Sequence, residues 1–253
     1  MYHDIVFSRE AHFSIIVVAD VSEGMAGSKI GMVNETLRQL GSMLMELEQE
    51  YFTIPPRACV LAFSKSCNWV PSKLVSCHEL TIPSFDAAGR ADYAQMCRRL
   101  SRRDLFQNPS CSYAPLILLI SDGLLADTDE YADALEELGK NNCYKVSYKF
   151  ALPTCKEANT ELLSSFTGKT ETVLRPAANS DEMLKKIATL VQRLSYGTPN
   201  RYYDSEEDRQ TGMREWLLEI IRSVNTESST APRALTDTQN TMSAHLQVEV
   251  DEW

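Results

Sequence analysis

The stretch Phe13-Ser-Ile-Ile-Val-Val-Ala-Asp20-Val-Ser22-Glu-Gly24-Met25 decides the fold of this chain. Seven mostly apolar residues end abruptly at Asp20, and a Ser/Gly turn leads from there into a long helical pattern. A continuous apolar run indicates a strand that is buried on both faces of a parallel sheet. A second such run, 115–120, ends in Ser121-Asp122-Gly123. Because α/β sheets place ligand sites at the carboxyl ends of their strands, we expect a site between Asp20 and Asp122.

The composition is ordinary for a globular protein, with an acidic balance. The chain has 253 residues, 43% of them hydrophobic, and a net charge of −10. Its length suits one large domain with additions or two small domains. The negative charge argues against nucleic acid and anionic membranes as partners and favours cations or basic protein surfaces. No segment reaches the roughly 20 apolar residues of a membrane span, and the amino terminus lacks the features of a signal peptide. We therefore expect a cytoplasmic protein.

Cysteine and histidine spacing argue against a metal site built from these residues. The seven cysteines are scattered without a Cys-x-x-Cys pair, which indicates reduced thiols rather than a zinc site or a disulfide framework. The four histidines form no pair at the spacing of helical metal ligands. Neither a Gly-x-Ser-x-Gly motif nor a phosphate-binding loop is present, so the sequence does not support a hydrolase or a nucleotide site.

Strand and helix patterns alternate along the chain, which predicts an α/β fold with helices on both faces of a mostly parallel sheet. Pro71 suits an edge strand far better than a central one, and we expect one antiparallel edge strand. The predicted strands are 13–19, 57–63, 67–77, 115–120, 145–152 and 172–175, and the predicted helices are 25–50, 92–102, 128–140, 159–167, 180–194 and 210–224.

The composition changes near Gly197, where we place a domain boundary. Residues 1–197 are expected to form the α/β domain. Residues 198–253 are expected to form an extension, with an amphipathic helix at about 209–224 and then a flexible acidic tail. The apolar stripe of this helix has two interpretations: it packs on its own domain, or it docks in a groove of another protein. The stripe consists of Met213, Trp216, Leu217, Ile220, Ile221 and Val224.

Two motifs and the helix between them are similar to a known family. Asp20-Val-Ser22-Glu-Gly24, the long helix that follows, and Ser121-Asp122-Gly123 after a buried strand resemble the von Willebrand factor A (vWA) domain. The resemblance covers about residues 12–195 and implies a Rossmann-like three-layer sandwich. The segment Met25-Ala-Gly-Ser-Lys-Ile-Gly-Met-Val-Asn-Glu35 is most similar to bacterial tellurium-resistance proteins of the TerY type.

The resemblance implies a metal-ion-dependent adhesion site (MIDAS), which in the family is made of an Asp-x-Ser-x-Ser turn, a later Thr and a later Asp. Asp20, Ser22 and Asp122 match this pattern, whereas Gly24 stands at the second Ser and Ala91 at the Thr. Mg²⁺ requires near-octahedral oxygen ligands. The loss of two hydroxyl ligands therefore predicts a degenerate site that binds Mg²⁺ weakly or not at all.

Without a metal, the two carboxylates are expected to accept backbone N–H groups at their turns, and Ser22 to cap the first helix. Two converging carboxylates also need a compensating group. We expect Arg90 or an ordered water between them. The alternative is that Asp86 or Asp92 substitutes as a metal ligand on a rearranged loop.

The resemblance further implies a non-enzymatic interaction or scaffold module that binds a protein at the face formed by loops 20–25, 86–92 and 122–128. Similarity to the TerY type implies work beside a protein kinase and a Ser/Thr protein phosphatase in bacterial stress or defence signalling. The alternative is a metal-dependent enzyme, or a regulatory subunit of a kinase/phosphatase system, that uses Asp20 and Asp122. The residues expected to contact the partner are Glu23, Gly24, Met25, Arg90, Ala91, Asp92, Gly123 and Trp216.

Overall fold

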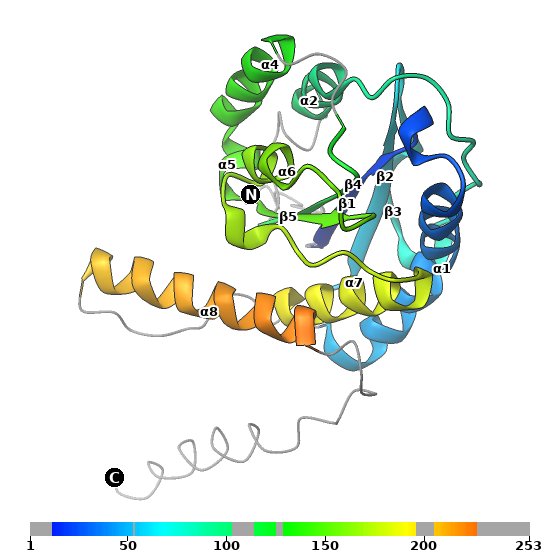
Figure 1. Cartoon of the computed structure of the whole chain (residues 1–253). Coiled ribbons are helices and arrows are strands. Elements are labelled where there is room, and N and C mark those ends of the chain that lie inside the picture. The colour runs from blue at the N-terminus through cyan, green and yellow to red at the C-terminus, as the bar shows by residue number, and fades with distance from the viewer. Residues whose placement is uncertain (1–11, 53, 103–113, 125–128, 196–204, 227–253) are drawn as a thin grey trace, which may run out of the picture.

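A computed structural model describes residues 12–52, 54–102, 114–124, 129–195 and 205–226. Within these ranges the strands form a five-stranded sheet of order β3-β2-β1-β4-β5 (Figure 1). All neighbours pair in parallel except β3, which runs antiparallel to β2 at the edge. This confirms the predicted α/β fold with one antiparallel edge strand. The strands are β1 (Phe13–Asp20), β2 (Pro56–Phe63), β3 (Cys67–Ser76), β4 (Leu116–Ser121) and β5 (Tyr148–Pro153).

Helices cover both faces of the sheet (Figure 1). One face carries α1 (Ser28–Tyr51), α7 (Ser180–Ser195) and α8 (Glu206–Thr226). The other carries α2 (Tyr93–Ser101), α4 (Asp129–Lys140), α5 (Asn142–Val146) and α6 (Thr160–Thr167). Three short 3-10 turns complete the described elements: η1 (Glu23–Met25), η2 (Cys77–Glu79) and η3 (Thr170–Thr172).

The central strand β1 explains why the deciding stretch is almost entirely apolar. Every residue of β1 is buried. Because side chains alternate along a strand, Ile15 and Val17 pack with α1 and α7, whereas Ile16 and Val18 pack with α2 and α6. Each apolar side chain of the run thus belongs to one of two separate cores, and a further polar residue at either set of positions would be buried.

Two of the predicted strands differ from the structure. Residues 172–175 do not form a strand: the chain makes the turn η3, and the pairing with β5 is reduced to an isolated bridge between Ala151 and Val173. The strand expected from Lys145 begins at Tyr148 instead, since residues 142–146 form the short helix α5. The Asn141 side chain starts this helix by accepting hydrogen bonds from two backbone N–H groups, those of residues 143 and 144.

The helix predicted from Met25 begins later, at Ser28, after the turn η1. Further along, the start of α7 is capped by Asn179 rather than by the predicted Ser180, because the Asn179 side chain accepts a hydrogen bond from the backbone N–H of Glu182 at 2.9 Å. The predicted cap Thr128 lies outside the described residues.

Helix α8 occupies the region where an amphipathic helix is predicted, and it packs on the rest of the chain. Its residues Ile220, Ile221 and Val224 are buried in the core that contains α7. The ring of Trp216 packs edge-on against that of Tyr148, with 5.7 Å between centroids. These contacts favour the first of the two interpretations of its apolar stripe. The predicted tail after residue 226 lies outside the described residues.

No helix in the described ranges combines the length and the apolar character needed to cross a membrane.

Candidate functional site

Asp20 and Asp122 lie side by side in the fold, as their places after two apolar runs predict. β1 and β4 are parallel neighbours, and each aspartate stands at or just after the carboxyl end of its strand. The chain leaves β1 toward β2 on one side, while β4 lies on the other, so the pair sits where the strand order reverses. Ligand sites of open α/β sheets lie at such points. Both side chains are buried, with exposed fractions of 0% and 1%.

Both oxygens of the Asp20 carboxylate accept hydrogen bonds from the protein. Oδ1 accepts from the backbone N–H of Ser22 at 2.9 Å, and Oδ2 accepts from the hydroxyl of Ser121 at 2.6 Å. The Ser121 proton is thereby engaged, so the Tyr93 phenol donates to the Ser121 oxygen, 2.5 Å away. Burial raises the pKa of Asp20 above its usual range; hydrogen bonds from Ser121 and Ser22 oppose this rise, and the charge of Asp122 adds to it.

Asp122 is paired with a cation of the chain itself. Its Oδ1 accepts from the backbone N–H of Leu124 at 3.0 Å, and its Oδ2 accepts from the Lys29 ammonium at 2.7 Å. The same ammonium donates to the carbonyl oxygen of Gly24 at 3.0 Å. Partial burial by itself lowers the pKa of Lys29, but the hydrogen bond and the charge of Asp122 outweigh this and leave the pKa raised. Lys29 is therefore charged at neutral pH and compensates Asp122.

Gly24 and Ala91, which stand where the family has a Ser and a Thr hydroxyl, differ in their surroundings. A Cβ at Gly24 would lie 3.3 Å from Asp122 Oδ2 and 3.8 Å from the Ser22 hydroxyl. A side chain at position 24 would thus border the carboxylates. Ala91 instead belongs to the core beneath the sheet and is 6% exposed. Asp92, considered as a substitute ligand, caps α2 by accepting from the backbone N–H of Gln95 at 2.7 Å.

The loops around the pair are fixed to one another by backbone hydrogen bonds. Glu23 N donates to Gly89 O at 2.7 Å, and Ala88 N donates to Val21 O at 3.0 Å. Gly123 has a φ of +72°, and a Cβ there would lie 2.7 Å from the carbonyl oxygen of Asn159. Only glycine suits both this backbone conformation and this close approach. Loops 20–25 and 86–92 and residues 122–124 therefore have a defined arrangement, whereas residues 125–128 of the third expected loop lie outside the described residues.

Beside the loops lies a hollow of about 530 Å³. The predicted contact residues Arg90, Ala91 and Asp92 line it, with further residues from the turn after β2, the start of α2 and the start of α4. Its lining includes charged residues of both signs: Lys65 and Arg90 are positive, and Asp92 and Glu130 are negative. A partner surface with both donors and acceptors fits such a lining better than a simple anion or cation.

The remaining predicted contact residues are distributed unevenly. Glu23 and Gly24 are exposed at this face, whereas Gly123 is buried behind it. Met25 is fully buried, with its sulfur 3.6 Å from the hydroxyl of Thr154, so its side chain does not reach a partner in this structure. Trp216 lies on α8, against Tyr148, and belongs to a different part of the molecule.

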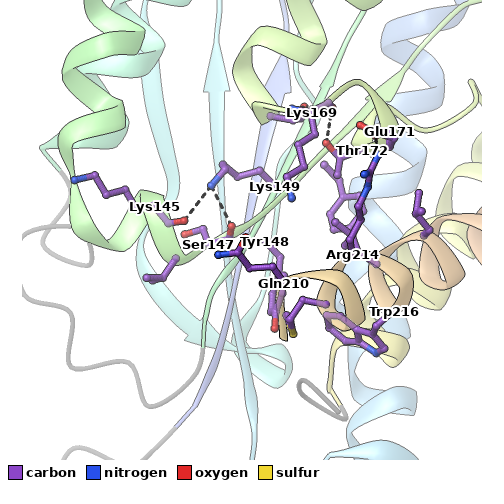
Figure 2. Close-up of a pocket in the computed structure, with 16 residues that line it drawn as sticks. Lys145, Ser147, Tyr148, Lys149, Lys169, Glu171, Thr172, Gln210, Arg214 and Trp216 are labelled. Carbon is purple, nitrogen blue, oxygen red and sulfur yellow. Dashed lines mark hydrogen bonds and ion pairs between the residues drawn. The ribbon is translucent and has the colours of Figure 1, made fainter. Parts of the chain in front are cut away.

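A second hollow, of about 700 Å³, lies between β5 and α8 and contains Trp216 (Figure 2). Four cationic side chains line it, yet two of them have partners within the protein. The Lys149 ammonium donates to the carbonyls of residues 144 and 147 at the end of α5, at 2.7 and 3.2 Å. The Arg214 guanidinium pairs with Glu171 at 3.3 Å. These contacts join α5 to β5 and α8 to η3, and we assign them a structural role.

Three residues of the site around Asp20 and Asp122 were not predicted from the sequence: Lys29, Ser121 as a hydrogen-bond donor, and Tyr93. A signal for Lys29 existed in the sequence. It follows the Ser22–Gly24 turn by only a few residues, and a helix that begins beside a carboxylate brings its first side chains within reach of that carboxylate. Tyr93 had no such signal, because its contact with Ser121 joins residues 28 apart along the chain.

No protein-family model and no curated protein sequence matches this chain. Solved structures do match it. A von Willebrand factor type A protein from Catenulispora acidiphila is similar over 74% of this chain and 43% of its own, with a TM-score of 0.54 and 13% identity. The ArnB paralog VWA2 from Sulfolobus acidocaldarius is similar over 71% of this chain and 45% of its own, with a TM-score of 0.52 and 14% identity.

Proximal thread matrix protein 1 from the mussel byssus, solved with a zinc-occupied MIDAS motif, is similar over 74% of this chain and 46% of its own, with a TM-score of 0.55 and 11% identity. This chain thus spans less than half the length of each of these solved chains. At such identities the likeness concerns the fold. Together with the strand order and the layers of helices, it shows that the chain has the fold of a von Willebrand factor A domain.

Proposed function

We propose that this protein is a non-enzymatic interaction module that binds a partner protein without a metal, through the face formed by loops 20–25, 86–92 and 122–124. One observation carries the proposal: the Lys29 ammonium lies 2.7 Å from Asp122 Oδ2 and 3.0 Å from Gly24 O. In a MIDAS a divalent cation compensates the carboxylates. Here a covalently attached monovalent cation does so.

The donor set does not suit Mg²⁺ in this arrangement. Each of the four carboxylate oxygens of Asp20 and Asp122 accepts a hydrogen bond. A divalent ion would have to displace the Lys29 ammonium, and no hydroxyl is present at positions 24 and 91 to complete an octahedron. The site is in this sense a degenerate MIDAS. Partner binding then depends on shape, hydrogen bonds and the mixed charges around the hollow beside Arg90.

The biological setting is proposed from the sequence resemblance to TerY-type proteins. It implies a cytoplasmic protein of a bacterial stress or defence pathway, including tellurium resistance. Its partners would be a protein kinase and a Ser/Thr protein phosphatase.

The alternative, an enzyme that uses Asp20 and Asp122 on a metal, is less well supported. Such a mechanism needs a carboxylate oxygen directed at a metal or a substrate. Asp20 instead binds Ser22 and Ser121 in a buried network, and Asp122 is held by Lys29. The arrangement stabilises the loops rather than presenting a free base.

The proposal is tested by affinity capture of partners from the native cells with the tagged full chain, washed with and without a chelator. We expect the same partner in both washes. Arg90→Glu, at the rim of the hollow, should abolish capture. Lys140→Glu is the matched control, because it makes the same kind of charge reversal at an exposed position at the end of α4.

A partner that is lost on chelation and regained with Mg²⁺ would contradict the metal-free mode of binding. Equal loss of the partner with Arg90→Glu and Lys140→Glu would contradict the location of the binding face. A kinase or a phosphatase among the captured proteins would support the signalling assignment.

A further inference from the structure

The end of α1 and the turn η2 bring together three side chains of different chemistry. They lie at the edge of the sheet where the parallel strands begin, opposite the edge where these strands end and Asp122 lies. Glu48 lies in the last turn of α1, and Cys77 and His78 lie in η2. This edge is where β3 ends beside the start of β2, since Ser76 pairs with Arg57. Helix α1 separates this cluster from Lys29 by roughly 28 Å, at about 1.5 Å per residue. The cluster is therefore independent of the face described above.

The three side chains converge on one point. The Cys77 thiol donates to Glu48 Oε2 at 2.8 Å, and His78 Nε2 lies 3.3 Å from the same oxygen. All three potential ligand atoms lie within 4.8 Å of one another. Cys77 is 2% exposed, whereas the side chains of Glu48 and His78 are 24% and 62% exposed. The thiol thus forms the floor of the cluster, and the carboxylate and imidazole form its rim.

The position of Cys77 is fixed by the fold. A Cβ at Gly41 would lie 3.1 Å from the carbonyl oxygen of Leu80 and 3.3 Å from that of Cys77. The glycine therefore allows η2 to lie directly on α1. Leu40 and Leu44 of α1 are buried in the same core as Cys77, so the helix that carries Glu48 is anchored as well.

We propose that Glu48, Cys77 and His78 bind a divalent transition-metal ion, with Zn²⁺ as the best fit. Thiolate, imidazole and carboxylate are the ligands that Zn²⁺ takes in proteins, whereas Mg²⁺ and Ca²⁺ take oxygen ligands alone. A tetrahedral zinc site with bonds of about 2.0 to 2.3 Å has ligand–ligand separations of roughly 3.3 to 3.8 Å. The separation of 3.3 Å between His78 Nε2 and Glu48 Oε2 fits this range, whereas the 2.8 Å between the Cys77 sulfur and Glu48 Oε2 requires this partly exposed carboxylate to move outward by less than about 1 Å.

Uptake of the ion replaces the proton that now joins Cys77 and Glu48. Without the ion, the thiol donates its proton in a hydrogen bond to Glu48 Oε2. The ion then forms a bond to the sulfur, and the proton leaves to solvent. Three protein ligands leave the fourth tetrahedral position to a water molecule on the open side, beside His78.

The bound ion would fasten η2, and with it the end of the edge strand β3, to α1. β3 pairs with β2 on one side only, as the last strand of the described sheet. A ligand that binds the folded state alone raises the stability of that state. Zn²⁺ should therefore raise the melting temperature of the full chain.

The test uses the reduced, chelator-treated full chain titrated with Co²⁺, a spectroscopic substitute for Zn²⁺. We expect stoichiometric binding with a thiolate-to-cobalt charge-transfer band in the near ultraviolet, which Zn²⁺ abolishes by displacement. Cys77→Ser should remove the band. His78→Ala, at an exposed position that does not threaten folding, should weaken Zn²⁺ binding at least about tenfold.

Matched controls are Cys155→Ser, at a partly exposed thiol, and His12→Ala; both should leave the titration unchanged. Asp122→Asn should also leave it unchanged, which keeps this test separate from that of the partner-binding face. Absence of the band, its retention in Cys77→Ser, or its loss in Cys155→Ser or Asp122→Asn would overturn the proposal.

Discussion

Lys29 lies one residue into α1, and its ammonium reaches back to the carboxylate of Asp122 at the end of β4. The Asp122 side chain is 1% exposed and that of Lys29 is 25% exposed. A buried carboxylate without a counterion is costly, because neither water nor a cation then solvates its charge. The pair is therefore better understood as compensation of an obligatory charge at the strand end than as a surface ion pair.

Lys29→Met should lower the free energy of unfolding by about 1 to 3 kcal/mol, because Asp122 loses its cation while the apolar stem of the side chain is retained. Chemical denaturation measures the change. Lys73→Met, at an exposed position of β3, is the control and should stay within about 0.5 kcal/mol of the original chain. If both variants were equally stable, the ion pair between Lys29 and Asp122 would make no contribution to the stability of the fold.

The double variant Gly24→Ser/Lys29→Met restores a hydroxyl and removes the competing cation. We expect millimolar Mg²⁺ to raise its melting temperature but not that of the original chain. A Cβ at position 24 would lie 3.3 Å from Asp122 Oδ2, so this carboxylate has to shift by a few tenths of an ångström to admit the side chain. Stabilisation of the original chain by Mg²⁺ would show that Lys29 does not exclude the ion.

Ser121 connects three groups: it donates to Asp20, and it accepts from Tyr93 and from the backbone N–H of Gly123. Ser121→Ala leaves all three without this partner and should cost about 2 to 4 kcal/mol, whereas Tyr93→Phe removes a single bond and should cost about 0.5 to 1.5 kcal/mol. Equal costs in urea denaturation would contradict the central position of Ser121.

Among the elements, those buried on both sides were predictable and those at the margin were not. The runs at β1 and β4 are almost entirely apolar because each of their apolar side chains lies in one of two cores. Residues 145–147 were also predicted to belong to a strand, but the Asn141 side chain caps the helix α5, which includes residues 145 and 146. Val173 follows a similar apolar pattern, yet only one bridge forms there. Local hydrogen bonds determine whether such segments form a strand, and the hydrophobic pattern of the sequence does not predict these hydrogen bonds.

The junction of α5 and β5 contains a partly buried lysine with a pH-dependent effect. Burial, and to a smaller extent the charge of Lys169, lowers the pKa of Lys149 from 10.5 to about 8. Between these two values the unfolded chain binds a proton that the folded chain does not, so the contribution of Lys149 makes stability rise with pH. Below about pH 8 both states are protonated, and this dependence disappears.

Lys149→Met should therefore lack the rise in the free energy of unfolding that the original chain shows between about pH 8 and about pH 10. Denaturation at several pH values compares the two slopes. Lys145→Met, at the wall of the same hollow, is the control and should keep the slope of the original chain. A slope that survives in Lys149→Met belongs to another group.

In the molecule as a whole, the two proposed sites lie at opposite edges of the sheet, near the two ends of α1. The edge with Asp20 and Asp122 was predictable, since carboxyl ends of parallel strands meet at one edge. Neither Lys29 nor the Glu48 cluster was predicted. Cys77 and His78 lack the spacing of known motifs, and Glu48 is brought to them by the packing of η2 on α1. The spacing of residues along the sequence predicts a metal site whose ligands lie on one helix or strand better than a site whose ligands come from two.

Because of this separation, changes at the two edges should be independent. The stability effects of Lys29→Met and His78→Ala should add within about 0.5 kcal/mol in the double variant. Zn²⁺ should stabilise Lys29→Met as much as it stabilises the original chain. Coupling beyond that margin would mean that α1 transmits a conformational change between its ends.

The ammonium of Lys29 differs from a bound ion in one more respect: it has no dissociation constant. Its local concentration is set by the length of a side chain and a turn of backbone, and does not change with the composition of the surroundings. A face that depends on Mg²⁺ is loaded or emptied as the free ion rises and falls. Under the proposed function, this protein would recognise its partner equally well when divalent ions are scarce.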